Sequence, residues 1–326
     1  MPRLLVTCGD PNGIGPEIIL KSLVRSQRKP FTIVGDIDHF LATASELSVD
    51  FQFTESDLLT PSPADPNIVP FINIPFEDAR VPGEANPKHA SGIISVLEHA
   101  TSLCLSGQFQ AMVTAPINKA VLKDGAQFAF PGHTEFLADL SGARRPVMML
   151  VGPGLRTVPV TIHIPLKDVP SELTPDLFRE TITVTHGDLQ KKFGLSNPKL
   201  VVAGLNPHAG EDGKIGTEER DWIQTEIETL RTSGIEISGP YPADTLFHSK
   251  ARSQYDAAIC MYHDQALIPV KTLAFDEGVN TTLGLPFVRT SPDHGTAFDI
   301  AGTGRAREDS FLAAVSLAEK MAHCVN

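Results

Sequence analysis

Three histidines follow short apolar segments that are predicted to be strands. They are His163 in VPVTIHIP, His208 in LVVAGLNPHAGE and His263 in AAICMYHDQ. Ligands of open α/β sheets bind beyond the carboxyl ends of the strands, so these imidazoles could converge although they lie far apart in the sequence. Three neutral imidazoles with one open position suit zinc or a similar divalent ion. The alternative is that each ring is an isolated polar group bonded to nearby backbone, and no H-E-x-x-H or H-x-H element decides between the two.

A second group of residues could bind an anion. Arg289 stands in an otherwise uncharged stretch, TTLGLPFVRTSP, and Lys271 and Asn280 precede it. A cation in such a place pairs with an anion, either a carboxylate of the protein or a phosphate of a ligand, and the sequence leaves both open. In the turn FPGHTE, Thr134 could cap the helix that follows and His133 could contact an anion at its N-terminus. Capping alone is the alternative for that turn.

The turn GDPNGIGPE, residues 9–17, joins a predicted strand to a predicted helix. Such a turn presents backbone N–H groups that could contact an anion, although a tight turn with a helix start explains the pattern equally well. The turn lacks the third glycine of the G-x-G-x-x-G fingerprint, and no Gly-Lys-Ser/Thr follows it. The sequence therefore does not support a Rossmann or P-loop cofactor site.

The elements that must position these residues alternate along the chain. Short apolar runs predict strands, and apolar residues at helical spacing predict helices. Two of the strands, 147–151 and 157–162, read as a hairpin, and residues 54–90 read as loops. This alternation predicts an α/β fold with a largely parallel sheet. The remaining strands are expected at 4–7, 31–34, 111–114, 200–205 and 257–261, and the helices at 16–24, 91–105, 176–193, 218–231 and 310–322.

Composition excludes several classes of protein. The chain has 326 residues and a formal net charge of −12, which argues against nucleic acid as a partner because phosphate backbones attract basic surfaces. No apolar run reaches the roughly 18 residues of a membrane-spanning helix, so we expect no membrane association. The four cysteines are far apart and form no C-x-x-C pair. This usage is typical of a reducing compartment, and we expect a cytoplasmic protein.

Two motifs together resemble a known superfamily. GDPNGIGPE near the start and HGTAFDIAG near the end are similar to motifs of the isocitrate/isopropylmalate dehydrogenase superfamily, whose members are metal-dependent and oxidise hydroxy acids with NAD(P). The blocks TAPINKAVL, GHTEFLA, LNPHAGEDGKIGTEE and GVNTTLGLPFVRTSPDHGTA further resemble the family of 4-hydroxythreonine-4-phosphate dehydrogenases. That family belongs to pyridoxal 5′-phosphate biosynthesis. The resemblance extends from about Val6 to Asn326.

This resemblance implies an architecture of two α/β/α domains with a cleft between them. Residues 1–128 plus 290–326 would form a first domain on the dinucleotide side. Residues 129–289 would form a second domain with the metal, substrate and dimer contacts. The resemblance also implies a homodimer whose metal site is shared between subunits.

The same resemblance implies roles for individual residues. The metal, which would be Zn, Mg or Co, is implied to lie on His163, His208 and His263. NAD or NADP is implied to lie near His294 and Asp299. Asp244 and Asp264 are candidates for the general base, although each could instead orient a metal-bound histidine. The implied substrate-binding positions are His133, Thr134, Lys271, Asn280 and Arg289.

The implied reaction is the oxidation of 4-phosphohydroxy-L-threonine to 2-amino-3-oxo-4-phosphohydroxybutanoate, which decarboxylates to 3-amino-2-oxopropyl phosphate. Two departures from the family pattern stand near the substrate positions: Pro131 occupies a place where a threonine is expected, and Asp276-Glu277 occupy one where a basic residue is expected. The second alters charge near the implied phosphate site. One alternative is therefore the same chemistry on another phosphorylated four-carbon hydroxy acid. A metallohydrolase is another, because three histidine ligands with an open position also suit water activation. A silent protein of the same fold is a third.

Overall fold

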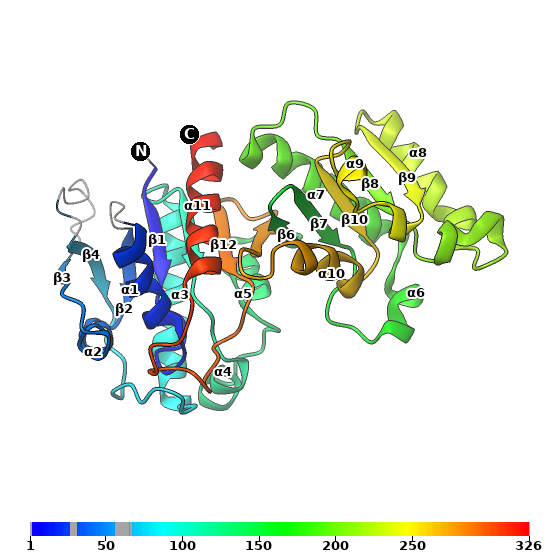
Figure 1. Cartoon of the computed structure of the whole chain (residues 1–326). Coiled ribbons are helices and arrows are strands. Elements are labelled where there is room, and N and C mark those ends of the chain that lie inside the picture. The colour runs from blue at the N-terminus through cyan, green and yellow to red at the C-terminus, as the bar shows by residue number, and fades with distance from the viewer. Residues whose placement is uncertain (1, 27–30, 56–64, 66, 326) are drawn as a thin grey trace. The chain divides into compact units, whose positions relative to one another are not determined.

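The computed structural model describes residues 2–26, 31–55, 65 and 67–325, and the chain divides into two compact units (Figure 1). The first unit contains Met1–Arg144 and Leu285–Asn326, and the second contains Arg145–Gly284. These limits differ from the expected 1–128 plus 290–326 and 129–289. Residues 133–141 belong to the first unit because Phe136 packs there in one core cluster with Ile93 and Leu97.

The sheet of the first unit has the strand order β3-β4-β2-β1-β5-β12, and every neighbouring pair is parallel. Its central strands are buried along their whole length, as expected for a parallel sheet that helices cover on both faces. The bounds are β1 Leu4–Thr7, β2 Thr32–Gly35, β3 Gln52–Glu55, β4 Ile68–Asn73, β5 Ala111–Thr114 and β12 Val288–Pro292.

Helices cover this sheet in two layers. The helix α3 contacts β1, β2 and β5, and both α4 and α5 pack against α3. The C-terminal helix α11 contacts β12 and β5, and α1 packs on α11. Figure 1 shows α11 in front of the strands and α3 behind them. The bounds are α1 Gly15–Ser26, α2 Ile37–Leu47, η1 Pro87–His89, α3 Ala90–Leu105, α4 Lys119–Ala126, α5 His133–Ser141 and α11 Asp309–Cys324.

The second unit has a mixed sheet with the order β11-β6-β7-β10-β8-β9. The pairs β11–β6 and β6–β7 are antiparallel, and the pairs β7–β10, β10–β8 and β8–β9 are parallel. Side chains alternate along β6: Val147 and Met149 join one core cluster, while Met148 and Leu150 join another. The bounds are β6 Val147–Gly152, β7 Leu155–Pro159, β8 Leu200–Ala203, β9 Ile237–Tyr241, β10 Ala257–Cys260 and β11 Val279–Leu283.

Those two clusters correspond to helices on the two faces of the sheet. The first cluster includes residues of α7 and α8, and the second includes residues of α10. The helix α8 is preceded by one π-helical turn over Glu219–Ile223. The other bounds are η2 Leu166–Asp168, α6 Val169–Glu172, α7 Pro175–Phe193, η3 Pro207–Gly213, α8 Gln224–Thr232, η5 Ala243–Thr245, α9 Ser249–Arg252 and α10 His263–Leu273.

The α/β fold class is confirmed, as are the predicted strands, helices and hairpin, with their ends shifted by a few residues. The prediction that residues 54–90 are loops is wrong at β4, at the end of β3, at η1 and at the first residue of α3. Residues 56–64 and 66 lie outside the described part of the chain. The strand β4 contains Pro70, and a proline inside an apolar run argues against a strand. None of the helices in the described residues is long and apolar enough to cross a membrane.

Candidate active site

The three predicted histidines follow three neighbouring parallel strands of the second unit. His163 comes after β7, His263 comes after β10, and His208 comes after β8. The strands β7, β10 and β8 are adjacent in the sheet and parallel to one another. All three histidines therefore come after the carboxyl ends of these strands, where open α/β sheets bind their ligands.

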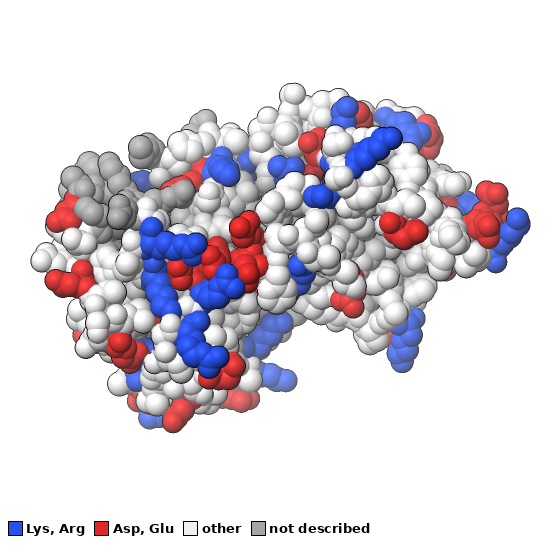
Figure 2. Space-filling model, viewed as in Figure 1, with Lys and Arg blue, Asp and Glu red and all other residues white. Residues whose placement is uncertain are grey.

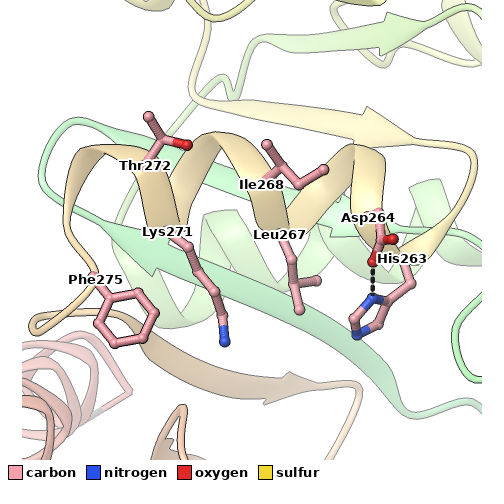
Figure 3. A pocket seen from close by; sticks show the side chains of 7 residues that line it. All are labelled: His263, Asp264, Leu267, Ile268, Lys271, Thr272 and Phe275. Atoms are coloured by element: carbon pink, nitrogen blue, oxygen red, sulfur yellow. Dashed lines mark hydrogen bonds and ion pairs between the residues drawn. The ribbon is translucent and has the colours of Figure 1, made fainter.

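Two of these rings lie side by side. The ring centroids of His163 and His263 are 5.7 Å apart, and their planes are inclined by 43°. His263 is the first residue of α10, and its Nδ1 lies 2.7 Å from Oδ1 of Asp264 (Figure 3). A carboxylate accepts a hydrogen bond here, so the ring carries its proton on Nδ1 and keeps the lone pair of Nε2 for another partner.

The third histidine lies in a turn of unusual backbone conformation. The φ angles are 54° at His208, 51° at Ala209, 79° at Gly210, 44° at Glu211 and 56° at Asp212. Left-handed residues other than glycine cost roughly 1–2 kcal/mol each, and a run of them is rare. Backbone strain of this kind is found most often at functional sites, where the surrounding structure maintains it.

The polar groups that maintain the turn come from the segment after it. Oε1 of Glu219 accepts a hydrogen bond of 2.7 Å from the backbone N–H of Asn206, and Oε2 accepts one of 2.9 Å from the Asn206 side-chain amide. A Cβ on Gly210 would lie only 2.8 Å from the same carboxylate. Only glycine fits at that position, so Glu219 and Gly210 together determine the path of the turn.

The three histidines do not form one site within a single chain. Across residues 2–26, 31–55, 65 and 67–325, no group of three His, Cys, Asp or Glu side chains could hold a metal ion. Asp244, one of the two candidates for the base, is exposed in η5, which contacts the turn η3 that carries His208. Asp264, the other, is the partner of His263.

In the first unit, Arg289 is the centre of a buried polar cluster. It lies in β12 and is only 3% exposed, and its Nη2 donates a hydrogen bond of 2.7 Å to Oγ1 of Thr114 at the end of β5. Burial lowers the pKa of the guanidinium to about 10, and the nearby charge of Glu135 opposes this shift. The sequence analysis missed Thr114, whose place at the end of a strand was its only signal.

The ring of His133 adds a second polar group to this cluster. Its Nε2 is buried and has no hydrogen-bond partner. Burial holds the pKa of His133 well below its usual value, and the positive charges of Arg289 and Lys119 act in the same direction. The expected cap is wrong: Gly132 is the N-cap of α5, and Thr134 lies inside the first turn. Thr134 is not the cap because α5 already begins at His133.

Two further predicted substrate residues lie in the second unit. Lys271 and His263 point to the same side of α10 and line one hollow, together with Leu267 and Phe275 (Figure 3). Nζ of Lys271 lies 5.9 Å from the centroid of the Phe275 ring. Asn280 lies in β11, and its Oδ1 is buried without a hydrogen-bond partner. The structure thus divides the predicted substrate residues between the two units.

The glycine-rich turn and the HGTA segment pack together in the first unit. The backbone N–H of Ile14 donates a hydrogen bond of 2.9 Å to the carbonyl oxygen of Thr296. Nε2 of His294 is buried without a partner, whereas Asp299 is exposed. Oδ2 of Asp10 is also buried without a partner, and burial raises the pKa of this carboxyl to about 6.

Acidic and basic side chains are interspersed over the face of the molecule that Figure 2 shows. In the first unit, for example, Arg25 pairs with Glu308 and Asp309. Surface charge therefore does not mark the polar clusters described above. They differ from the rest of the surface because they are buried and contain atoms without a hydrogen-bond partner.

The fold and these clusters define an α/β enzyme, and comparison with known proteins identifies its family. Residues 26–318 match the family described as "Pyridoxal phosphate biosynthetic protein PdxA". The chain belongs to this family, and the resemblance found in its motifs is confirmed.

Individual relatives agree with this assignment. The chain is 51% identical to 4-hydroxythreonine-4-phosphate dehydrogenase of Roseobacter denitrificans, over 98% of this chain and 97% of that one. The crystal structure of 4-hydroxythreonine-4-phosphate dehydrogenase from Klebsiella pneumoniae is 37% identical and superimposes with a TM-score of 0.91, covering 99% of this chain and 100% of the other. A terephthalate 1,2-cis-dihydrodiol dehydrogenase from Burkholderia xenovorans is 28% identical, with a TM-score of 0.68 and 98% of both chains covered.

Proposed function

We propose that this protein is an NAD(P)- and divalent-metal-dependent dehydrogenase that oxidises 4-phosphohydroxy-L-threonine at its C3 hydroxyl. The β-keto acid that results decarboxylates to 3-amino-2-oxopropyl phosphate. The observation that carries this proposal is the identity of 51% with a dehydrogenase of that name along almost the whole of both chains. A match confined to one domain or one motif would support a shared fold alone, whereas here the site residues of both units lie within the matched region.

The residues present fit a divalent metal. His163 and His263 offer two adjacent imidazoles, and Asp264 holds one of them with Nε2 free to bind. His208 would complete the set, which suits zinc or cobalt better than magnesium because magnesium prefers oxygen ligands. When bound, the metal would supply Lewis acidity that lowers the pKa of the substrate hydroxyl.

We infer that a second copy of the chain contributes to this metal site. One chain does not bring three ligands together among its described residues. Large apolar side chains are exposed on and just after α10, which begins at His263: Ile268 in the helix is 62% exposed, and Phe275, two residues beyond its end, is 77% exposed. A dimer that covers these side chains would remove apolar surface from water and bring histidines of two chains to one ion.

The other side chains would bind the substrate and move its proton. By the family resemblance, the residues that would bind the phosphate are Arg289, Lys271 and Asn280, with help from His133 and Thr134. The hydrogen bond between Asp264 and His263 supports a positioning role for Asp264, which leaves Asp244 as the candidate base. The dinucleotide would lie along the first unit near His294 and Asp299. The enzyme would act in the cytoplasm, consistent with the free cysteines of the chain.

A panel of substrates tests the proposal. The protein would be assayed with NAD and with NADP, with added zinc, magnesium or cobalt, by absorbance at the nicotinamide band. We expect the highest kcat/KM with 4-phosphohydroxy-L-threonine. A higher value with another phosphorylated four-carbon hydroxy acid, or with a cyclic dihydrodiol, would replace the substrate. A metallohydrolase would instead give no absorbance change at the nicotinamide band with either dinucleotide, whichever metal is added.

A further inference from the structure

Lys119 occupies an electrostatically unfavourable place in the first unit. It is the first residue of α4, directly after the N-cap Asn118, whose side chain accepts hydrogen bonds from the N–H groups of Ala120 and Val121. The N-terminus of a helix carries partial positive charge, so a cation in its first turn is disfavoured. The side chain of Lys119 makes no hydrogen bond and no ion pair with any described residue of the chain. The carboxylate of Glu135 lies nearby, but among the described residues no ion pair offsets this placement.

The side chain of Lys119 extends to the start of a second helix. A Cβ placed on Gly132 would lie 3.3 Å from Cε and 3.7 Å from Nζ of Lys119. Gly132 is the N-cap of α5, and no side chain caps the helix there. The first N–H groups of α5 and the ammonium of Lys119 thus lie side by side, and both favour an anion.

Independent observations indicate a ligand at this place. Nε2 of His133, in the first turn of α5, is buried and has no hydrogen-bond partner. The buried guanidinium of Arg289 and the ammonium of Lys119 both lie close enough to His133 to act on its ring, and Glu135 is the carboxylate beside them. This place thus brings together two cations, an imidazole whose Nε2 has no partner, and an uncapped helix start. The carboxylate of Glu135 opposes their positive charge.

We propose that Lys119 is a further substrate-binding residue, which holds the phosphate of a phosphate monoester together with Arg289, His133 and the N-terminus of α5. A phosphate offers three acceptor oxygens and close to two negative charges, which match several donors from different directions. A carboxylate has only two oxygens, and the guanidinium of one arginine can donate hydrogen bonds to both of them. For the identity of the substrate this inference rests on the proposed function, whereas for phosphate binding it does not.

The first test is kinetic. Lys119→Gln removes the charge but keeps the length of the side chain. We expect it to raise KM for the phosphorylated substrate about 10- to 100-fold and to leave kcat within about threefold, because a bound ground-state phosphate is bound equally in the transition state. Lys119→Arg should restore most of the affinity. The matched control is Lys123→Gln, an exposed lysine one turn further along α4, which should leave KM unchanged.

The second test is independent of the substrate. Binding of inorganic phosphate to the full-length protein would be measured by calorimetry for the wild type and for both glutamine variants. We expect Lys119→Gln to weaken phosphate binding at least about tenfold and Lys123→Gln to leave it unchanged. Equal phosphate affinity in the wild type and Lys119→Gln, or no binding to the wild type, overturns the inference. Loss of phosphate binding in a protein that does not oxidise the phosphorylated amino acid would refute the proposed function and leave the role of Lys119 standing.

Discussion

The buried polar cluster around Arg289 in the first unit differs from the sheet edge of the second unit, which His163, His208 and His263 follow, in how the protein maintains it. In the first unit, Arg289 is buried and hydrogen-bonded to Thr114, and its position is supported within one chain. In the second, His163 and His263 lie together, but His208 lies on a left-handed turn and joins no three-residue metal group among the described residues.

This difference shows two ways of holding a polar site ready for a ligand. The first unit keeps a cation and a neutral imidazole out of water, and a bound anion would offset the cost of desolvation. The second unit keeps a strained backbone in place with the carboxylate of Glu219, and a metal bridging two chains would complete the site. The predictions below test whether each site depends on the feature assigned to it.

The largest effect is expected in the second unit. His208→Ala should lower metal-dependent turnover about a thousandfold or more, because loss of a ligand removes several kcal/mol of Lewis-acid stabilisation. The variant should still fold, because Ala209 already adopts the same left-handed conformation. Turnover with saturating metal and circular dichroism would be measured, with His99→Ala as the exposed control. Equal turnover of His208→Ala with and without a chelator, at the wild-type rate, would remove this residue from the metal site.

Arg289→Ala tests the first unit. We expect KM for the phosphorylated substrate to rise about 10- to 100-fold, because a hydrogen bond to a charged group contributes about 1.5–3 kcal/mol. Steady-state kinetics would be compared with those of Arg305→Ala, which alters an exposed arginine of the same unit. If Arg289→Ala has the KM of the wild type, Arg289 serves the structure and not the substrate.

Asp264→Asn sharpens the assignment of the two aspartates. Loss of the carboxylate that orients His263 should weaken metal binding about 10- to 100-fold, whereas kcat at saturating metal should recover most of its wild-type value. Titration with zinc gives the affinity, and Asp176→Asn is the control because the side chain of Asp176 is 87% exposed. A kcat that stays low at saturating metal would indicate that Asp264, and not Asp244, is the general base.

The smallest expected effect is on stability. The pKa of Asp10 is about 6 in the folded protein, above the roughly 3.9 of an unfolded chain. A raised pKa means that the folded state binds the proton more tightly, so this group destabilises the protein when ionised. The cost declines as pH falls from about 6 and is absent only below the unfolded pKa of roughly 3.9. Asp10→Asn should therefore add about 1–3 kcal/mol to the free energy of unfolding near pH 8 and much less near pH 4. Denaturant unfolding at both values of pH checks this. The same gain at both would show that burial of charge is not its cause.

Part of the candidate site could be predicted from single segments of the sequence. His163, His208 and His263 each follow an apolar run, and that pattern alone placed them at one edge of a sheet. Local patterns failed where two features of the same segment predict different structures. Pro70 argued against a strand in the apolar run that forms β4, and the polar turn before α5 suggested Thr134 as a cap although the helix begins one residue earlier. The place of Thr114 at a strand end was its only local signal, and no local pattern pointed to Lys119, because the groups that they approach, Arg289 and the start of α5, belong to other segments of the chain.

The sequence by itself determined the alternation of strands and helices, the family and the residue types that could bind a metal and an anion. It could do so because apolar periodicity and contiguous motifs are properties of neighbouring residues. Only the tertiary structure decided that Arg289 is buried against Thr114, that the first unit includes α5, and that His208 occupies a strained turn. Burial, strain and the approach of distant side chains depend on packing between segments remote in the chain, and no local pattern encodes them.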